Sequence, residues 1–182
     1  MPRVPPITGK SDVSAEHHAV VDHVLQVFGS VRGPFSMLLH SPTLAERMLG
    51  LVTFFRDASI VEPRLRSIAI LTAVREREAA YVWAAQVGAA RRNGLSHDVI
   101  DLLRAKGDPG ALPPEEHDIV TFTRQLMRTN RVEQPLFDAL AKRRGTQWMV
   151  ELTAALNYFA LLSGIVNAFE VAAAPDGDKL PG

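Results

Sequence analysis

Two stretches decide the fold of this chain: RLRSIAILTAV at residues 64–74 and, after a short charged corner, EAAYVWAAQV at residues 78–87. The first follows Glu62-Pro63 and has almost no polar face before Arg75, which is typical of a helix buried at the centre of a protein. In the second, small residues recur every four positions, and such a ridge lets a neighbouring helix approach closely. The sequence therefore predicts two adjacent central helices, and Asn93-Gly94 ends the second.

The rest of the chain also has helical periodicity, and no convincing run alternates apolar and polar residues as a half-buried strand does. We expect further helices over about 14–28, 41–59, 99–106, 114–129, a short one after Pro135, and one over about 146–174. This predicts an all-α bundle of about seven or eight helices. Residues 1–13 are expected to form an extended N-terminal arm, 14–174 a single helical domain, and 175–182 a flexible tail.

Composition excludes several classes of protein. The 182 residues are 47% hydrophobic and 22% charged, enough for one domain with a real core. Lys+Arg and Asp+Glu both number 20, and the longest basic runs lie where helices should end, so we expect no nucleic-acid partner. There is no cysteine, which excludes disulfides, thiolate metal sites and thiol peroxidase chemistry.

Two observations concern location. The N-terminal residues show no apolar signal-peptide core, so we expect a cytoplasmic protein. Thr153 to Ala174 approaches the length of a membrane-spanning helix, but it contains Asn157, Asn167 and Glu170. We therefore interpret it as a buried core or interface helix and expect no membrane partner.

The six histidines do not form a metal-binding motif, and no glycine-rich phosphate loop is present, so we expect no metal and no cofactor. The histidine of most interest is His40, which precedes Ser41-Pro42 between two apolar helices. Its imidazole either faces a cavity as an acid or base, or is bonded to the backbone of its loop.

A stripe of the second central helix is a candidate site. Steps of three and four place Ala79, Val82 and Gln86 on one face, with Trp83 at its border. An apolar surface with one amide is the usual composition of a ligand pocket, in which Gln86 orients the ligand. The alternative is core packing with Gln86 bonded internally.

The two opening stretches, together with ARRNGLS at residues 90–96, resemble the core motif of the carboxymuconolactone decarboxylase-like family, in the same superfamily as the alkylhydroperoxidase D proteins. RVPP at 3–6 and HSP at 40–42 resemble the N-terminal region of its thiol-free branch, and the segment 151–169 resembles its last helix. The resemblance implies an all-α fold, a homo-oligomer (a trimer or a hexamer), and a pocket beside the two central helices near a subunit interface.

The resemblance also implies a chemistry, from which this chain departs. In the redox branch, cysteines would occupy Ala79 and Val82, a histidine Gln86, and a proton-relay glutamate Ser67. In the decarboxylase branch, a glutamate commonly occupies Val82 and a histidine Gln86. None of these four residues titrates near neutral pH, and a glutamine side chain binds oxygen atoms but does not act as a base.

Two hypotheses follow. In the first, the protein is a cofactor-independent decarboxylase-like lyase that acts on a small or polycyclic organic acid or lactone in an apolar pocket. His40, Gln86 and Tyr81 are then the catalytic candidates, and Ser67, Ala79, Val82 and Trp83 the substrate-binding candidates. In the second, it is an oligomeric small-molecule binder without catalysis.

Overall fold

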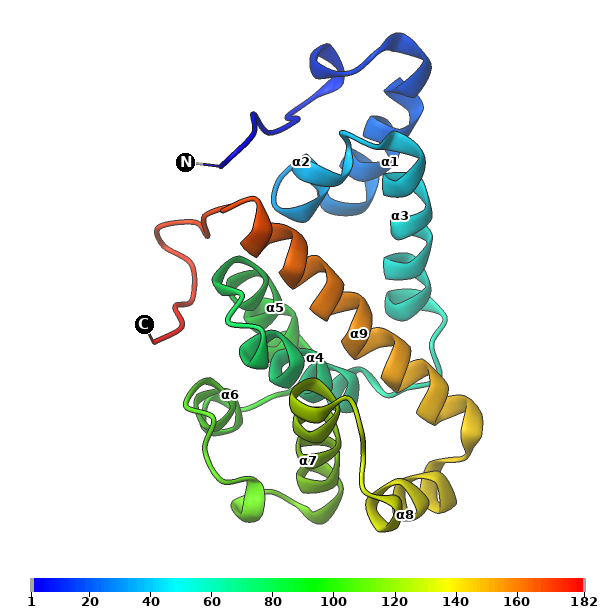
Figure 1. Cartoon of the computed structure of the whole chain (residues 1–182), viewed down its shortest axis with the longest axis vertical. Helices are drawn as coiled ribbons and strands as arrows, with labels where there is room; N and C mark the ends of the chain where they lie inside the picture. The colour runs from blue at the N-terminus through cyan, green and yellow to red at the C-terminus, as the bar shows by residue number, and fades with distance from the viewer. Residues whose placement is uncertain (1, 182) are drawn as a thin grey trace.

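The computed structural model describes residues 2–181, which form nine α-helices and no strand (Figure 1). The helices are α1 (His18–Phe28), α2 (Pro34–Leu38), α3 (Pro42–Asp57), α4 (Pro63–Glu76), α5 (Ala80–Arg92), α6 (His97–Arg104), α7 (Pro114–Thr129), α8 (Gln134–Arg144) and α9 (Thr146–Ala168). Short 3-10 turns occupy Lys10–Asp12, Ala15–His17 and Pro109–Ala111. The predicted all-α fold is confirmed, and the additional helix beyond the predicted eight is α2, which has only five residues.

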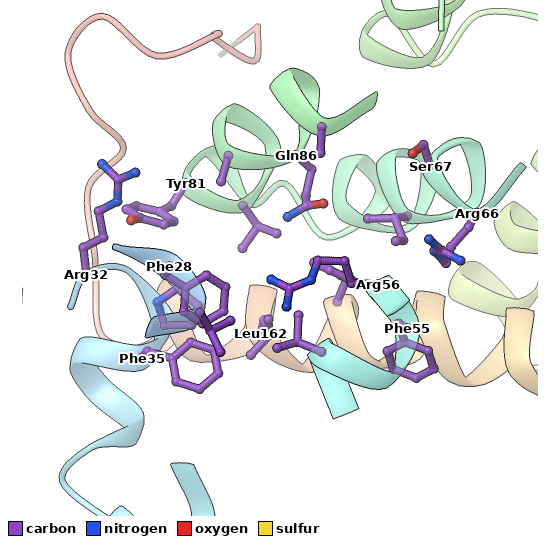
Figure 2. Close-up of a pocket in the computed structure, with 18 of the residues that line it drawn as sticks. Phe28, Arg32, Phe35, Phe55, Arg56, Arg66, Ser67, Tyr81, Gln86 and Leu162 are labelled. Carbon is purple, nitrogen blue, oxygen red and sulfur yellow. The ribbon is translucent and has the colours of Figure 1, made fainter. Parts of the chain in front are cut away.

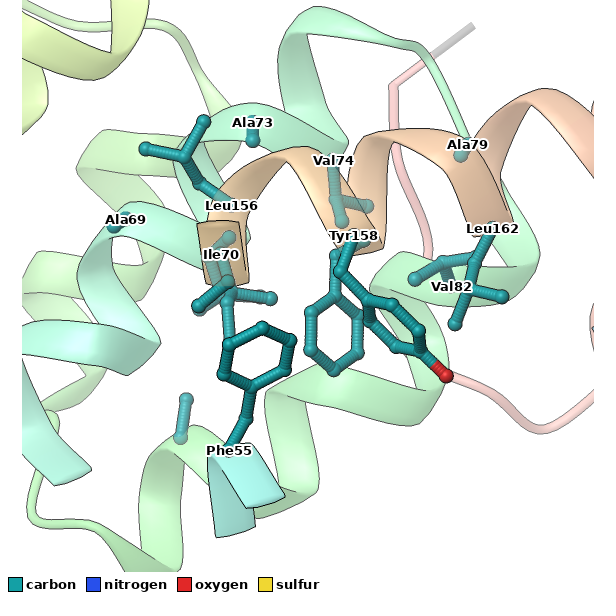
Figure 3. Close-up of a cluster of buried hydrophobic side chains, with 14 of the residues drawn as sticks. Phe55, Ala69, Ile70, Ala73, Val74, Ala79, Val82, Leu156, Tyr158 and Leu162 are labelled. Atoms are coloured by element: carbon teal, nitrogen blue, oxygen red, sulfur yellow. The ribbon is translucent and has the colours of Figure 1, made fainter. Parts of the chain in front are cut away.

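Helix α4 lies at the centre of the bundle. Every residue from Leu65 to Arg75 is buried, and the helix packs against α5, α7 and α9. Figure 3 shows side chains of α4 meeting those of α3, α5 and α9 in one apolar cluster, which includes Phe55, Val82 and Leu156. The buried central helix predicted from residues 64–74 is therefore confirmed.

Helix α9 crosses the middle of the molecule (Figure 1). It is long and apolar enough to span a membrane, with a mean hydropathy of 1.6 over its 18-residue window. However, 56% of that window is buried inside the fold, as expected for a core helix of a soluble-type protein.

The predicted end of this last helix, near Ala174, is wrong, because α9 ends at Ala168. Glu170 has a φ of 53°, and the Val171 N–H donates to the Val166 carbonyl at 2.9 Å, which closes the helix end. Arg3 of the N-terminal arm then binds this end, because its backbone N–H donates to the Phe169 carbonyl at 3.0 Å. An apolar run predicts burial, but it does not predict the residue at which a helix stops.

The C-terminal tail crosses one face of α5. Its Asp178 accepts hydrogen bonds from the Trp83 indole at 3.1 Å and from Arg104 at 2.6 Å, and it pairs with Arg91 at 3.1 Å. The side chain of Trp83 is fully buried. Asp178 of the tail thus contacts side chains of both α5 and α6.

Candidate functional site

A cavity of about 460 Å³ lies between α4 and α5 on one side and α9 with the α1–α3 region on the other (Figure 2). This volume lies within the range of roughly 300–1,000 Å³ that is usual for small-molecule sites. Its apolar lining consists of Val27, Phe28, Pro34, Phe35, Val52, Phe55, Ile70, Val82, Ala85, Ala89, Phe159 and Leu162. The cavity reaches the surface beside Arg32 and Arg92, which line it and are exposed.

Helix α5 contributes one wall of the cavity through Tyr81, Val82, Ala85, Gln86 and Ala89. These positions fall on one side of a helix with 3.6 residues per turn. The Gln86 amide has no hydrogen-bond partner among residues 2–181, and Figure 2 shows it extending into the cavity. Its donor and acceptor groups are therefore free to bind a ligand.

Helix α4 and the end of α5 contribute a polar pair to the same wall. The Asn93 side-chain amide donates to the Ser67 hydroxyl oxygen at 2.9 Å, and both residues line the cavity. Because Ser67 accepts this bond, its own O–H remains available to donate to a ligand.

The cavity has an unusual distribution of charge. Four arginines line it, namely Arg32, Arg56, Arg66 and Arg92, whereas no aspartate, glutamate, lysine or histidine among the described residues does. Arg56 pairs with Asp57 at 2.9 and 3.0 Å, and the other three form no ion pair within residues 2–181. Uncompensated positive charge in a cavity with apolar walls attracts anions.

Tyr81 lies at one end of the cavity, close to Arg32 (Figure 2). Burial raises the pKa of Tyr81, which the positive charge of Arg32 lowers only in part. The phenol is therefore protonated at neutral pH. The ring lies against Gly33, where an added Cβ would be 2.2 Å from Tyr81 Cε1. With a φ of 61° as well, this position requires glycine.

Solved structures share this architecture. A peroxidase-related protein of Ralstonia eutropha, described as an alkylhydroperoxidase AhpD core, aligns over 95% of both chains with a TM-score of 0.74 and 15% identity. The debrominase Bmp8, solved as a cysteine-to-alanine variant with 2,3,4-tribromopyrrole, covers 96% of this chain and 95% of its own at a TM-score of 0.73 and 15% identity. A protein of unknown function from Agrobacterium tumefaciens, suggested to be an AhpD antioxidant defence protein, covers 80% of this chain and 100% of its own at 0.70 and 16%.

The chain has the AhpD-like fold. This likeness concerns the fold alone, because no protein-family model and no curated protein matches the sequence. Among the described residues, the AhpD-like bundle of this chain brings together no group of three His, Asp or Glu side chains that is placed to hold a metal ion.

Four of the residues singled out from the sequence meet at the cavity: Ser67, Tyr81, Val82 and Gln86. The alternative in which Gln86 is sealed inside the core does not describe the structure, since its amide faces the cavity. The resemblance implies titratable residues at four positions of this AhpD-like fold. Three of these positions, occupied here by Ser67, Val82 and Gln86, lie in the cavity wall.

Three other predicted site residues lie elsewhere. Ala79 caps α5 from outside the helix and is fully buried, so helical spacing does not place it beside Gln86. Trp83 is rotated by about 100° from Val82 and faces the C-terminal tail. His40 is exposed and outside the cavity lining, and its Nε2 lies 3.0 Å from the Pro5 carbonyl oxygen. A carbonyl only accepts, so this nitrogen donates, as in the alternative of a loop histidine bonded to backbone.

The arginines of the cavity are the residues that the sequence interpretation overlooks. Arg66 had a usable signal, because it is a charged residue within a stretch predicted to be buried on nearly all sides. Burying a charged side chain is costly unless an ion pair or hydrogen bonds compensate it, so such a residue is a candidate for ligand binding. Arg32, Arg56 and Arg92 had no comparable signal, since they occupy loops and helix ends where arginines are ordinary.

Proposed function

We propose that this protein binds a small organic acid in the cavity and acts on it without a metal or cofactor, as a decarboxylase-like lyase. The observation that carries the proposal is an apolar cavity of about 460 Å³ that is lined by four arginines and, within residues 2–181, by no carboxylate. The apolar walls bind the body of the ligand, and the guanidinium groups bind its carboxylate. The debrominase that shares the fold was solved with a small aromatic molecule, which supports an organic ligand.

The polar groups of the cavity fit the steps of a decarboxylation. The bond between the carboxyl carbon and its neighbour breaks, carbon dioxide leaves, and the electron pair passes into a conjugated carbonyl as an enolate. Gln86 and Arg56 extend into the cavity from opposite walls and donate to that oxygen (Figure 2). Tyr81 then donates a proton to the carbon and regains one from water.

Release of carbon dioxide tests this chemistry directly. The protein is incubated with lactone carboxylic acids that carry a conjugated carbonyl, and carbon dioxide is measured. We expect Tyr81→Phe and Gln86→Ala to lower a detected rate by about 100-fold or more, as losses of a proton donor and of an oxyanion donor do. His40→Ala, a change outside the cavity, should leave the rate unchanged. A rate that survives both cavity substitutions contradicts this assignment.

A second candidate function is ligand binding without catalysis. One observation favours it: no histidine, aspartate or glutamate lines the cavity among the described residues, so the usual catalytic acids and bases are missing from its walls. Calorimetric binding of the acids with no release of carbon dioxide from any of them would select this function over the lyase.

The proposal includes a homo-oligomer, a trimer or a hexamer, in the cytoplasm. Its support is a set of exposed large apolar side chains on α3 and α9, namely Leu44, Leu51, Val150 and Leu161. Such side chains become buried when copies associate. Size-exclusion chromatography with light scattering should give three or six times the chain mass of 19.9 kDa, and a monomer at all concentrations contradicts this part.

A further inference from the structure

Arg66 combines deep burial with free hydrogen-bond donors. It lies in the first turn of α4, is 8% exposed and lines the cavity. One terminal nitrogen of its guanidinium donates to the Val61 carbonyl at 2.7 Å, and the other guanidinium N–H groups have no partner among residues 2–181. In Figure 2 the side chain extends from α4 into the space between α4 and the α3–α9 side of the cavity.

The charge of Arg66 also has no direct counter-ion in the described chain. Burial lowers the pKa of Arg66 and the charge of Glu151 raises it, yet the two residues do not form an ion pair. Glu151 instead accepts hydrogen bonds from Gln147 and from the Ile60 N–H, each at 2.8 Å. An arginine does not lose its proton in a protein, so its charge stays buried without contact to an anion.

The other cavity arginines differ from Arg66 in at least one of these two properties. Arg32 and Arg92 are exposed, so water solvates their charges. Arg56 is neutralised by Asp57, which holds it with two hydrogen bonds. Among the arginines that line the cavity, Arg66 alone is both buried and without a carboxylate.

We infer that Arg66 binds the carboxylate of the ligand and determines the preference of the cavity for acids, an inference that rests on the proposed function. The Ser67 hydroxyl, on the same helix, is the neighbouring donor. In Figure 2 Arg66 and Ser67 lie at one end of the cavity and Tyr81 at the other. The ligand is therefore an aromatic or polycyclic acid whose carboxylate points to α4 and whose apolar body extends along α5.

This arrangement has a consequence for the lyase reaction. An ion pair with Arg66 stabilises the carboxylate before reaction, which opposes its loss as carbon dioxide. The group that binds Arg66 is therefore retained, and a simple aromatic monocarboxylate binds without turnover.

Binding of 2-naphthoate and of its neutral analogue 2-naphthamide, measured by calorimetry, tests the inference. Wild-type protein should bind the acid at least ~10-fold more tightly, because hydrogen bonds to a charged group are stronger than neutral ones. Arg66→Met should remove this preference and leave the affinity for the amide within about 2-fold. The matched control is Arg75→Met, which removes a second buried arginine of α4 outside the cavity and should keep the preference.

The outcomes separate the inference from the proposed function. If the wild type prefers the acid and Arg66→Met does so equally, or if Arg92→Met removes the preference instead, Arg66 is not the carboxylate-binding residue, while acid binding stands. If the wild type binds neither compound, or both equally, the proposed function fails with it. Should Arg66→Met not fold, Arg66→Gln, which keeps an N–H donor near the Val61 carbonyl, is measured by the same criteria.

Discussion

The two ends of α4 treat buried charge in opposite ways. At the C-terminal end, Arg75 is 9% exposed, donates to the Arg104 carbonyl at 2.6 Å and pairs with Glu78. Next to it, Glu76 pairs with Arg128 at 2.6 Å and lies 3.8 Å from Arg124. At the N-terminal end, Arg66 is buried as deeply but faces a cavity and has no ion pair.

This difference distinguishes charges that stabilise the fold from charges that are open to a ligand. Buried ion pairs are strongly destabilised when one partner is removed, because the other charge then remains without compensation. A buried charge with no ion pair contributes no such stability, so the position of Arg66 at the cavity points to binding. The following substitutions test whether the two ends of α4 differ in this way.

The largest effect is expected at the paired end. Glu76→Gln leaves the charges of Arg124 and Arg128 without their carboxylate, and Arg124 has a side chain only 12% exposed. We expect a loss of about 3 kcal/mol in the free energy of unfolding, measured by urea denaturation. Glu170→Gln is the control, because it removes an ion pair with Arg3 in which both side chains are more than half exposed, and its loss should be below ~1 kcal/mol. Equal losses for both variants would contradict the importance of burial at this end.

The next effect concerns the end of the cavity opposite Arg66, where Tyr81 lies against Gly33. Gly33→Ala places a Cβ into the ring of Tyr81 at a φ of 61°, so we expect a loss of about 2 kcal/mol and weaker binding of 2-naphthoate. Gly50→Ala is the control, because an added Cβ there meets nothing within 4 Å on the exposed side of α3. It should raise stability by ~0.5–1 kcal/mol. A Gly33→Ala protein as stable as wild type would show that the contact with Tyr81 is relaxed.

An intermediate effect is expected at the tail, where the charges are partly exposed. Burial raises the pKa of Asp178, but hydrogen bonds from Trp83 and Arg104 and the charges of Arg104 and Arg91 lower it by more. The carboxylate therefore stabilises the fold above its unfolded pKa of about 3.9, and this stabilisation is lost as the pH falls through the lower folded value. Asp178→Asn should cost about 1 kcal/mol at pH 7, and the difference from wild type should shrink below about pH 4. A difference that is constant from pH 7 to pH 3 contradicts the ion pairs.

The periodicity of apolar residues predicted the fold well, because it indicates which residues are buried. The apolar run at 64–74 predicted the central helix, and the spacing of Val82 and Gln86 predicted part of one wall of the cavity. The end of α9 at Ala168 is bound by Arg3, which lies at the other end of the sequence. No local pattern contains such a contact.

The candidate site was predicted only in part, because it too depends on contacts between segments that are distant in the sequence. Its second wall comes from α1–α3 and α9, and the absence of carboxylates near its arginines is a property of the assembled fold. His40 looked like a candidate because it lies between two apolar segments, but Pro5 of the distant N-terminal arm binds its ring. One-dimensional spacing shows which residues share a helix face, but not which other segment covers that face.

The smallest effect on stability is expected for Arg66→Met. This variant decides whether the two ends of α4 differ in the role of their buried charges. The substitution removes the donor to the Val61 carbonyl, which costs about 1 kcal/mol, but it also removes a buried charge that has no ion pair, which offsets that cost. The net change in the free energy of unfolding should be below ~1 kcal/mol in urea, whereas Arg75→Met, which loses the pair with Glu78 in addition to the donor to the Arg104 carbonyl, should cost about 2 kcal/mol. An Arg66→Met protein with wild-type stability and without the preference for 2-naphthoate over 2-naphthamide separates binding from folding at this residue. A loss as large as that of Glu76→Gln would instead mean that Glu151 compensates Arg66 at a longer distance, and the two ends of α4 would then be alike.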